Sequence, residues 1–274
     1  MGDNRQGKGS ADGGTDNRAL FLPACRHALV RTRAAGILTT LGEAIAELVW
    51  STRCIVCDAP GTVLCDSCRL RLPYIDRWLA CPRCGSPHGA TQCVSCNSYS
   101  LAEVGRSAVP FDRCVSAIEH RGIARSIITG YKDAGERRLA REIARLTFNV
   151  MPRTWMRQGA CISYVPADRV ARRRRGFDHM APIAREIARL AALPCVPLLY
   201  KQSTSDQRGL TRRERFANMT GAVRMDADVG GRLPPRVILV DDVYTTGATL
   251  FAASDALRDA GVNELYCATF ARVP

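Results

Sequence analysis

The sequence predicts an α/β fold, a parallel sheet flanked by helices, with a cysteine-rich module on its N-terminal side. Three observations lead to this prediction. From residue 111 onward, short apolar stretches of strand length alternate with amphipathic stretches of helical spacing. One of the apolar stretches, Val237–Val240, is followed by two carboxylates and a turn rich in threonine and glycine. Before residue 100, eight cysteines fall into four CxxC pairs.

Composition divides the chain into four segments. Residues 1–18 contain almost no apolar side chain, which predicts a disordered tail. Apolar residues then recur at helical spacing up to Val49, so we expect a helical segment over 19–50. The cysteine pairs define a module over 51–100, expected to be a double zinc ribbon, and the α/β domain follows over 111–274.

Strands that alternate with helices predict a parallel sheet that binds its ligand at the carboxyl ends of the strands. Within the α/β domain we expect strands at 115–118, 161–165, 196–200, 237–240 and 264–270, and helices at 122–131, at 136–150, around Ile183, Ile187 and Leu190, and from the Thr/Gly turn to Ala260.

The overall composition excludes some classes of protein and favours others. The 274-residue chain has no run of 18 apolar residues and no apolar stretch behind its N-terminal charges, so neither a membrane span nor a signal peptide is expected. We therefore expect a cytoplasmic location and no membrane partner. The formal net charge of +13 favours an anionic ligand, either a phosphorylated small molecule or nucleic acid.

The cysteine pattern predicts metal binding. Two near-copies of one spacing, CxxC-x₇-CxxC and CxxC-x₈-CxxC, could each supply four thiolates to a tetrahedral zinc ion, giving one or two ions in all. A redox CxxC and an iron–sulfur cluster are the alternatives. The spacing leaves open whether each copy closes its own site or the pairs interleave. His88 is expected to be solvated rather than a ligand. The candidate ligands are Cys54, Cys57, Cys65, Cys68, Cys81, Cys84, Cys93 and Cys96.

The stretch after Val240 suits a sugar phosphate. Asp241 and Asp242 suit hydroxyl groups or a metal ion, because two carboxylates do not attract a phosphate. The turn behind them is small or hydroxylated and leads into a helix, whose first N–H groups and dipole favour a phosphate. The alternative is a strand of a doubly wound sheet that ends in two acids by chance. The turn consists of Thr245, Thr246, Gly247, Ala248 and Thr249.

A basic stretch follows the strand predicted at 161–165. Arg169 and the four arginines from Arg172 to Arg175 precede Gly176, and we expect them to form a loop. Such a cluster is often a solvated surface. At the end of a strand that neighbours the acidic strand, however, its guanidinium groups and the backbone of Gly176 would suit a diphosphate.

The stretch from Val237 to Leu250 resembles the signature of type I phosphoribosyltransferases that binds 5-phosphoribosyl diphosphate (PRPP). From Cys54 onward, the chain resembles the ComF family, in which a zinc-ribbon module is fused to a phosphoribosyltransferase-like domain. Departures from the family pattern are Asp168, Asp178-His179 and Arg208. The matching blocks are the CxxC pairs, Tyr131-Lys132 with Gly135, Arg175-Gly176-Phe177, Gln207 with Gly209-Leu210 and Arg212, and the signature itself.

The resemblance implies a role for each matched position. Asp241 and Asp242 would bind the ribose hydroxyls of PRPP, directly or through Mg²⁺, and the turn would wrap the 5′-phosphate. Arg175, Gly176 and Lys132 would bind the diphosphate. The segment from Gln202 to Met219 would be a flexible loop that closes over the site and excludes water, with Gly209, Leu210, Arg212 and Arg215 as its matched residues.

Two functional hypotheses of different classes follow. The first is a Mg²⁺-dependent transfer of the phosphoribosyl group from PRPP to an acceptor that the sequence does not identify. The second is handling of single-stranded DNA in natural transformation, with the PRPP pocket kept as a sensor or a vestige. Against the second, aromatic residues make up 6% of the chain and do not alternate with the arginines, so a base-stacking surface is not predicted. A third reading makes the zinc module a rigid docking piece for other proteins.

Overall fold

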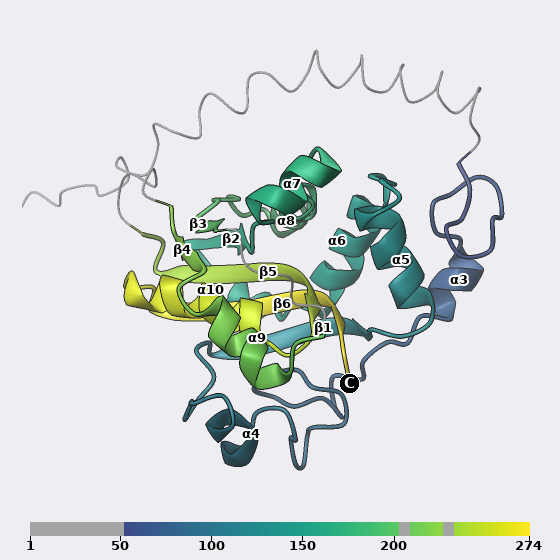
Figure 1. The fold of residues 1–274 in the computed structure, drawn as a ribbon. Coiled ribbons are helices and arrows are strands. Elements are labelled where there is room, and N and C mark those ends of the chain that lie inside the picture. Colours follow the sequence, from purple (N-terminus) through teal and green to yellow (C-terminus); the bar gives the residue numbers. More distant parts are fainter. Residues whose placement is uncertain (1–51, 203–208, 227–232) are drawn as a thin grey trace, which may run out of the picture. The chain divides into compact units, whose positions relative to one another are not determined.

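The α/β part contains a parallel sheet, as the sequence predicts, and four of the five expected strands form it. The computed structural model describes residues 52–202, 209–226 and 233–274 (Figure 1). The predicted tail at 1–18, the helical segment at 19–50, Gln207 and Arg208 lie outside these residues. Neighbouring strands are parallel throughout, in the order β1-β6-β5-β2. The strands are β1 (Arg113–Glu119), β2 (Ala160–Tyr164), β5 (Arg236–Tyr244) and β6 (Glu264–Arg272).

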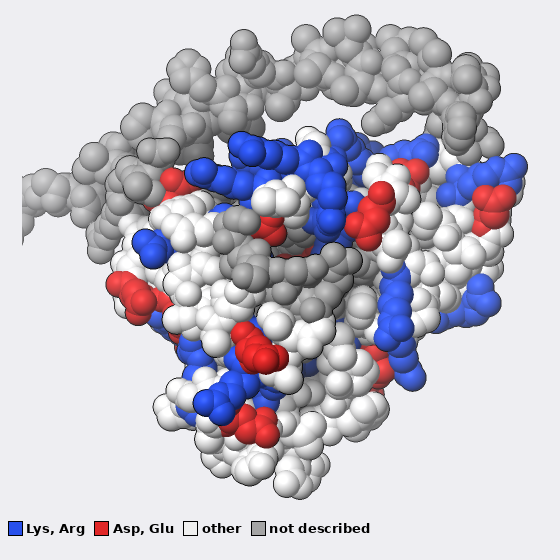
Figure 2. Space-filling view, viewed as in Figure 1, with Lys and Arg blue, Asp and Glu red and all other residues white. Residues whose placement is uncertain are grey.

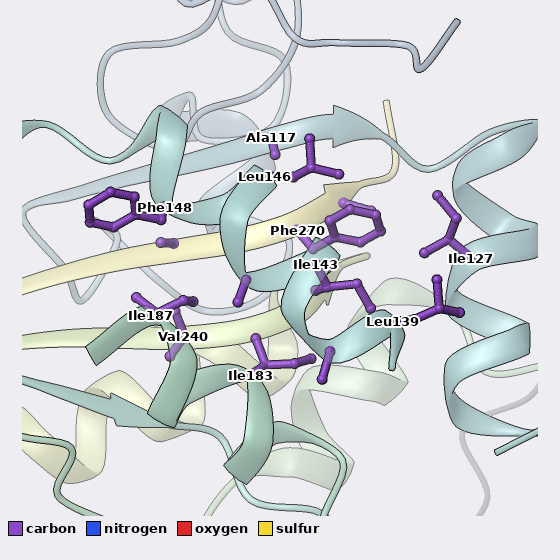
Figure 3. Packing of buried hydrophobic residues seen from close by; sticks show 14 of the residues in the cluster. Ala117, Ile127, Leu139, Ile143, Leu146, Phe148, Ile183, Ile187, Val240 and Phe270 are labelled. Carbon is purple, nitrogen blue, oxygen red and sulfur yellow. The ribbon is translucent and has the colours of Figure 1, made fainter. Parts of the chain in front are cut away.

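Helices cover both faces of this sheet, because β5 is apolar on both sides. Ile238 and Val240 pack into the hydrophobic cluster with α5 (Ile123–Lys132), α6 (Leu139–Val150) and α8 (Met180–Ala191). Figure 3 shows Val240 in this cluster beside Ile183 and Ile187 of α8. Val237 and Leu239 belong to the second cluster, which includes α10 (Ala248–Asp259). Burying each such side chain stabilises the fold by about 1.5–3 kcal/mol.

The strand predicted at 196–200 is not part of this sheet. Instead β3 (Leu199–Lys201) pairs antiparallel with β4 (Val223–Met225) in a separate two-stranded sheet. Next to β2 the chain makes only one bridge, between Ile162 and Cys195. Pro194 and Pro197 flank that bridge. Proline has no N–H to donate, so the ladder cannot extend along β2 and the chain turns away.

The basic stretch expected as a loop is a helix, α7 (Arg169–Arg175). The Asp168 carboxylate accepts a hydrogen bond from the backbone N–H of Ala171 at 2.7 Å and caps the first turn. Gly176, with φ at 76°, ends the helix. Arginine is a good helix former, so the arginines between the capping aspartate and the terminal glycine form one short helix.

Part of the predicted flexible loop is also helical. Arg212 and Arg215 lie in α9 (Arg212–Met219). Thr211 and Glu214 form a reciprocal capping box at its start, which explains why the helix begins there. Gly209 and Leu210 precede this helix outside any regular element. None of the helices in the described part of the chain is long and apolar enough to span a membrane.

The cysteine-rich region has little regular structure, and residues 53–274 form one compact unit. Cys114 of β1 donates its N–H to the carbonyl of Arg83 at 2.9 Å, and a Cβ on Gly85 would lie 2.7 Å from the carbonyl oxygen of Cys114. The second cysteine motif therefore packs directly on the backbone of β1. The remaining short helices are α3 (Asp66–Leu70), α4 (Ser98–Ala102) and the 3₁₀ turn η1 (Arg153–Trp155).

Candidate metal centres and phosphate site

The eight cysteines form two separate clusters, which settles the pairing that the spacing leaves open. Each near-copy closes its own site: within each group of four, all sulfur atoms lie within 4.8 Å of one another. His88 is outside both groups, and its side chain is exposed. The clusters are Cys54, Cys57, Cys65 and Cys68 (the first cluster) and Cys81, Cys84, Cys93 and Cys96 (the second cluster).

The geometry of both clusters fits a tetrahedral metal ion. Four sulfurs at about 2.3 Å from one ion lie about 3.8 Å apart. The sulfurs of Cys57 and Cys65 are 3.6 Å apart, and those of Cys84 and Cys93 are 3.5 Å apart. Donors also point at the sulfurs: the backbone N–H of Cys65 lies 3.4 Å from the Cys54 sulfur. Such bonds orient ligands and stabilise thiolate charge.

Asp241 and Asp242 lie in the last part of β5, not after it as predicted. Because successive side chains of a strand point to opposite faces, they leave the sheet in opposite directions. Asp242 is 5% exposed, and its Oδ2 forms an ion pair with Nζ of Lys132, the last residue of α5. His179 Nε2 lies 2.9 Å from the same oxygen. Asp241 Oδ1 accepts the backbone N–H of Asp242 at 2.9 Å.

These surroundings shift the pKa values of the two carboxylates in opposite directions. Burial and the neighbouring Asp242 charge raise the pKa of Asp241 to about 7. Burial alone would also raise the pKa of Asp242, but Lys132 and the His179 hydrogen bond hold that pKa well below its usual range. Asp242 is therefore the permanent anion of the pair, and Asp241 is the one that titrates near neutrality.

The turn after β5 leads directly into the N-terminus of α10. Gly247 is the N-terminal cap of α10, with φ at 90°, and makes no side-chain cap. The Ala248 N–H makes only a long contact, 3.5 Å, to the Thr246 hydroxyl, so the first-turn N–H groups of α10 are available to a ligand. Thr245 is exposed, and Thr246 and Thr249 are partly exposed, so their hydroxyls can reach the same anion. Ala248 is buried against the sheet.

Arg175 lies near the end of α5, whose last residue, Lys132, contacts the acidic pair. Its Nη2 lies 3.8 Å from Oδ1 of Asp133, the residue after Lys132, and its Nε is buried without a hydrogen-bond partner. Gly176 follows directly. The residues matched to the flexible loop are not brought to this place. Arg212 donates to the carbonyls of Ser95 and Ser100 beside the second cluster, and Arg215 donates to the carbonyl of Leu210.

His179 is a site residue to which sequence reasoning gave no role. It is 7% exposed, and the Tyr131 hydroxyl donates to its backbone oxygen at 2.5 Å. Its Nδ1 is buried without a hydrogen-bond partner. The one available signal was the departure from the family pattern at Asp178-His179. That departure placed a histidine in the basic segment without indicating that it faces Asp242.

Beside this site lies a cleft of about 590 Å³ between α7 and α8. Figure 2 shows Lys and Arg side chains gathered on the face of the molecule over α7. The Asp178 carboxylate accepts from the backbone of Ala167 and Met180, so its charge is already engaged. The cleft combines three arginines with two aromatic rings, which the sequence did not predict. These are Arg172, Arg173, Arg185, Tyr164 and Phe177.

Fold and site thus define an α/β protein with a parallel sheet, an acidic strand end beside a helix N-terminus, and two four-cysteine clusters. No protein-family model matches the chain. It is 27% identical over 228 residues to competence protein F of Haemophilus influenzae, covering 78% of this chain and 93% of the relative. It is 24% identical over 191 residues to competence protein ComFC of Streptococcus pneumoniae, covering 68% and 77%. ComFC of Bacillus subtilis is 20% identical over 203 residues, covering 74% and 80%.

The chain is therefore a distant homologue of competence proteins F and ComFC, and the predicted resemblance is confirmed at that level. Among solved structures, orotate phosphoribosyltransferase from Aeropyrum pernix is 16% identical, with 54% of this chain and 76% of that one covered. The TM-score of that match, 0.28, is too low to support an assignment.

Proposed function

We propose that this protein binds PRPP and transfers its phosphoribosyl group to an acceptor, with release of pyrophosphate. The observation that carries the proposal is the arrangement at the end of β5. There a buried, ionised carboxylate, Asp242, meets the cation of Lys132 a few residues before the open N-terminus of α10. A sugar that carries a 5′-phosphate and a diphosphate needs hydrogen-bond acceptors for its hydroxyl groups, N–H donors for its phosphate and a cation for its diphosphate.

The roles divide by chemistry. The first-turn N–H groups of α10 and the hydroxyls of Thr245, Thr246 and Thr249 would bind the 5′-phosphate. Asp241 and Asp242 would accept hydrogen bonds from the ribose hydroxyls. Lys132, which ends α5 at the same edge, would meet the diphosphate, with Arg175 behind it. Each group suits the charge of the part of PRPP assigned to it.

The acidic pair also fits magnesium, whose preferred ligands are carboxylate and phosphate oxygens. Asp242 is the stronger candidate, since its low pKa keeps it charged. In this structure Lys132 forms an ion pair with it and His179 lies within hydrogen-bond distance, so Lys132 would have to move towards the diphosphate when PRPP binds. Bound beside Asp242, the ion would neutralise charge on the leaving diphosphate.

Catalysis on this proposal is positioning and electrostatic stabilisation. The leaving diphosphate gains negative charge as the bond to the ribose breaks, and Lys132 is the nearest described cation to the acidic pair. His179 would hold the Asp242 carboxylate in place. The predicted flexible loop at 202–219 would exclude water from the sugar cation. Its residues 203–208 lie outside the described part of the chain, and its described C-terminal part is α9.

The test is calorimetric titration of the full chain with PRPP, with and without Mg²⁺, followed by an assay for pyrophosphate release in the presence of candidate acceptors. Mg²⁺-dependent binding supports the proposal. No binding at millimolar PRPP would reduce the motif to a remnant. Asp259→Asn is the matched control for variants of the acidic pair, because Asp259 is exposed at the far end of α10 and the charge change is the same.

For the clusters we propose structural zinc. Both offer four thiol ligands and no fifth group among the described residues, as in closed structural sites. Zinc binding supplies folding free energy to a module with so little regular structure. Two zinc ions per chain is the expected content, and iron absorbance or a single ion would contradict it.

A second candidate function is binding of single-stranded nucleic acid at the cleft beside α7. Arg172, Arg173 and Arg185 could neutralise phosphates, while Tyr164 and Phe177 offer rings on which bases can stack. The names of the competence proteins to which the chain is similar agree with this function. Unlike the PRPP site, this cleft has arginines that are exposed on the surface.

A further inference from the structure

Arg272 is a buried cation that neither function uses. It is the last residue of β6, its side chain is 1% exposed, and it is in register with Glu119 of β1 and Tyr244 of β5. A guanidinium stays charged at any ordinary pH. Burying it without a counter-charge is strongly unfavourable, so a nearby anion is required.

Within the described part of the chain, no carboxylate forms an ion pair with Arg272, and Glu119 pairs with Arg121 instead. The partner of Arg272 is the second cluster. Its Nη1 donates to the carbonyl oxygen of Cys84 at 2.7 Å, and its Nη2 donates to the Cys84 sulfur at 3.5 Å. Four thiolates around one zinc ion carry two net negative charges, so the loaded cluster supplies the counter-charge that Arg272 needs.

On its other side, Arg272 contacts the residue that supports the phosphate turn. Its guanidinium carbon lies 3.7 Å from the ring centroid of Tyr244, a close cation–π contact. Tyr244 is 4% exposed. Its hydroxyl lies 2.7 Å from the position of a Cβ on Gly247, the cap of α10. Cys84, Arg272, Tyr244 and Gly247 thus form one continuous line of contacts.

Among the described residues, the first cluster has no comparable connection to the turn. It packs on α5, where a Cβ on Gly130 would lie 2.8 Å from the side chain of Ile55. The guanidinium on its sulfur belongs to Arg71, which lies next to the cluster itself. The two clusters therefore differ in what they contact, and this difference provides an internal control.

We propose that Arg272 is a positioning residue that couples the metal of the second cluster to phosphate binding at the turn 245–249. With the cluster loaded, Arg272 is held by Cys84 and keeps Tyr244 beneath Gly247, in the conformation that binds an anion. With the cluster empty, the guanidinium loses its counter-charge and the support of the turn loosens. This inference rests on the proposed role of the turn as the 5′-phosphate site.

Coupling of this kind is reciprocal, since two ligands that support each other must change each other's affinity by the same factor. Ribose 5-phosphate should therefore tighten zinc binding at the second cluster and leave the first unchanged. The zinc affinity of each cluster is measured on the full chain by equilibrium competition with a chromogenic chelator, with and without ribose 5-phosphate. The variant Cys57→Ser disables the first cluster and so identifies the signal of the second.

We expect at least about a fivefold gain in zinc affinity at the second cluster. Arg272→Met should abolish the gain, and Arg272→Lys should keep only part of it, because lysine keeps the charge but not the flat guanidinium over the ring. Arg236→Met is the matched control: Arg236 pairs with Glu264 at the amino ends of β5 and β6, whereas Arg272 lies at the carboxyl end of β6, and its loss should leave the gain intact.

If ribose 5-phosphate binds the wild-type chain but leaves the zinc affinity of the second cluster unchanged, the coupling is refuted while the proposed function stands. If ribose 5-phosphate does not bind at all, the proposed function fails and the coupling fails with it. Should Arg272→Met not fold, Tyr244→Leu and Tyr244→Phe replace it. Loss of the gain in the first and its retention in the second is then the supporting result, and retention in both refutes the coupling.

Discussion

The His179 imidazole lies 2.9 Å from the Asp242 carboxylate, and both side chains are more than nine-tenths buried. Lys132 meets the same oxygen from α5. Asp242 is therefore the point at which β5, the end of α5 and the connection between α7 and α8 are held together. The geometry of the site therefore depends on the contacts of Lys132 and His179 with Asp242 as well as on the sheet.

Removing Lys132 should destabilise the protein through Asp242. Lys132→Met leaves a buried carboxylate with one partner, and we expect the free energy of unfolding to fall by about 1–3 kcal/mol. Adding Asp242→Asn removes the unpaired charge and should restore most of that loss. Urea unfolding of the two single variants and the double variant measures the coupling. Strictly additive losses would show that the two side chains do not interact in solution.

The stability of the metal-free acidic pair should depend on pH through Asp241. Its pKa of about 7 lies above the ordinary value of 3.8, so the folded state holds a proton that the unfolded state releases between those values. The free energy of unfolding should therefore fall as pH rises through this window. Asp241→Asn should remove the decline and raise stability at pH 8 by about 1–4 kcal/mol. The measurement is urea unfolding from pH 5 to 8 with zinc present. The control Asp259→Asn should keep the wild-type slope of the free energy of unfolding against pH. The same unchanged slope in Asp241→Asn would contradict the raised pKa of Asp241.

Two glycines at the ends of α10 separate backbone strain from contact with Tyr244. Gly247 and Gly261 have φ angles of 90° and 96°, but only Gly247 has neighbours within 4 Å of an added Cβ. Gly261→Ala should cost about 1–2 kcal/mol for its left-handed backbone. Gly247→Ala should cost at least about 1 kcal/mol more, because the buried Tyr244 must move. Thermal unfolding compares them, and equal losses would mean that Tyr244 does not fill this space. A Gly247 variant that no longer binds phosphate would therefore have lost binding partly because Tyr244 has moved.

Nucleic-acid binding at the α7 cleft should depend on salt. Replacing Arg172 and Arg173 with glutamate should weaken binding of single-stranded DNA and reduce the slope of log affinity against log salt by about 1.4, because two phosphate contacts are lost. Arg113→Glu with Arg157→Glu is the matched control, with the same charge change at exposed arginines near the amino ends of β1 and β2, whereas the cleft contains Tyr164 at the carboxyl end of β2. Equal effects of the two double variants would place the binding site elsewhere.

Local sequence order predicted most of the sheet and the site edge, since the apolar residues, acids and turn of β5 are contiguous. The departures come from features that depend on the third dimension. Pro194 and Pro197 turn β3 out of the sheet, and the spacing of the cysteines permits either pairing. The roles of His179 and Arg272 arise from partners 63 and 188 positions away in the sequence, which no local pattern reveals.

The central claim is that β5 and its turn form one site with two separable halves. The direct measurement is calorimetry of Asp242→Asn and the control Asp259→Asn against Mg²⁺-PRPP and against inorganic phosphate. Asp242→Asn should weaken Mg²⁺-PRPP about ten- to a hundredfold, corresponding to about 1.5–3 kcal/mol, and leave inorganic phosphate in the turn unchanged. The control should bind both as the wild type does. Equal PRPP affinity in Asp242→Asn and Asp259→Asn would contradict the claim.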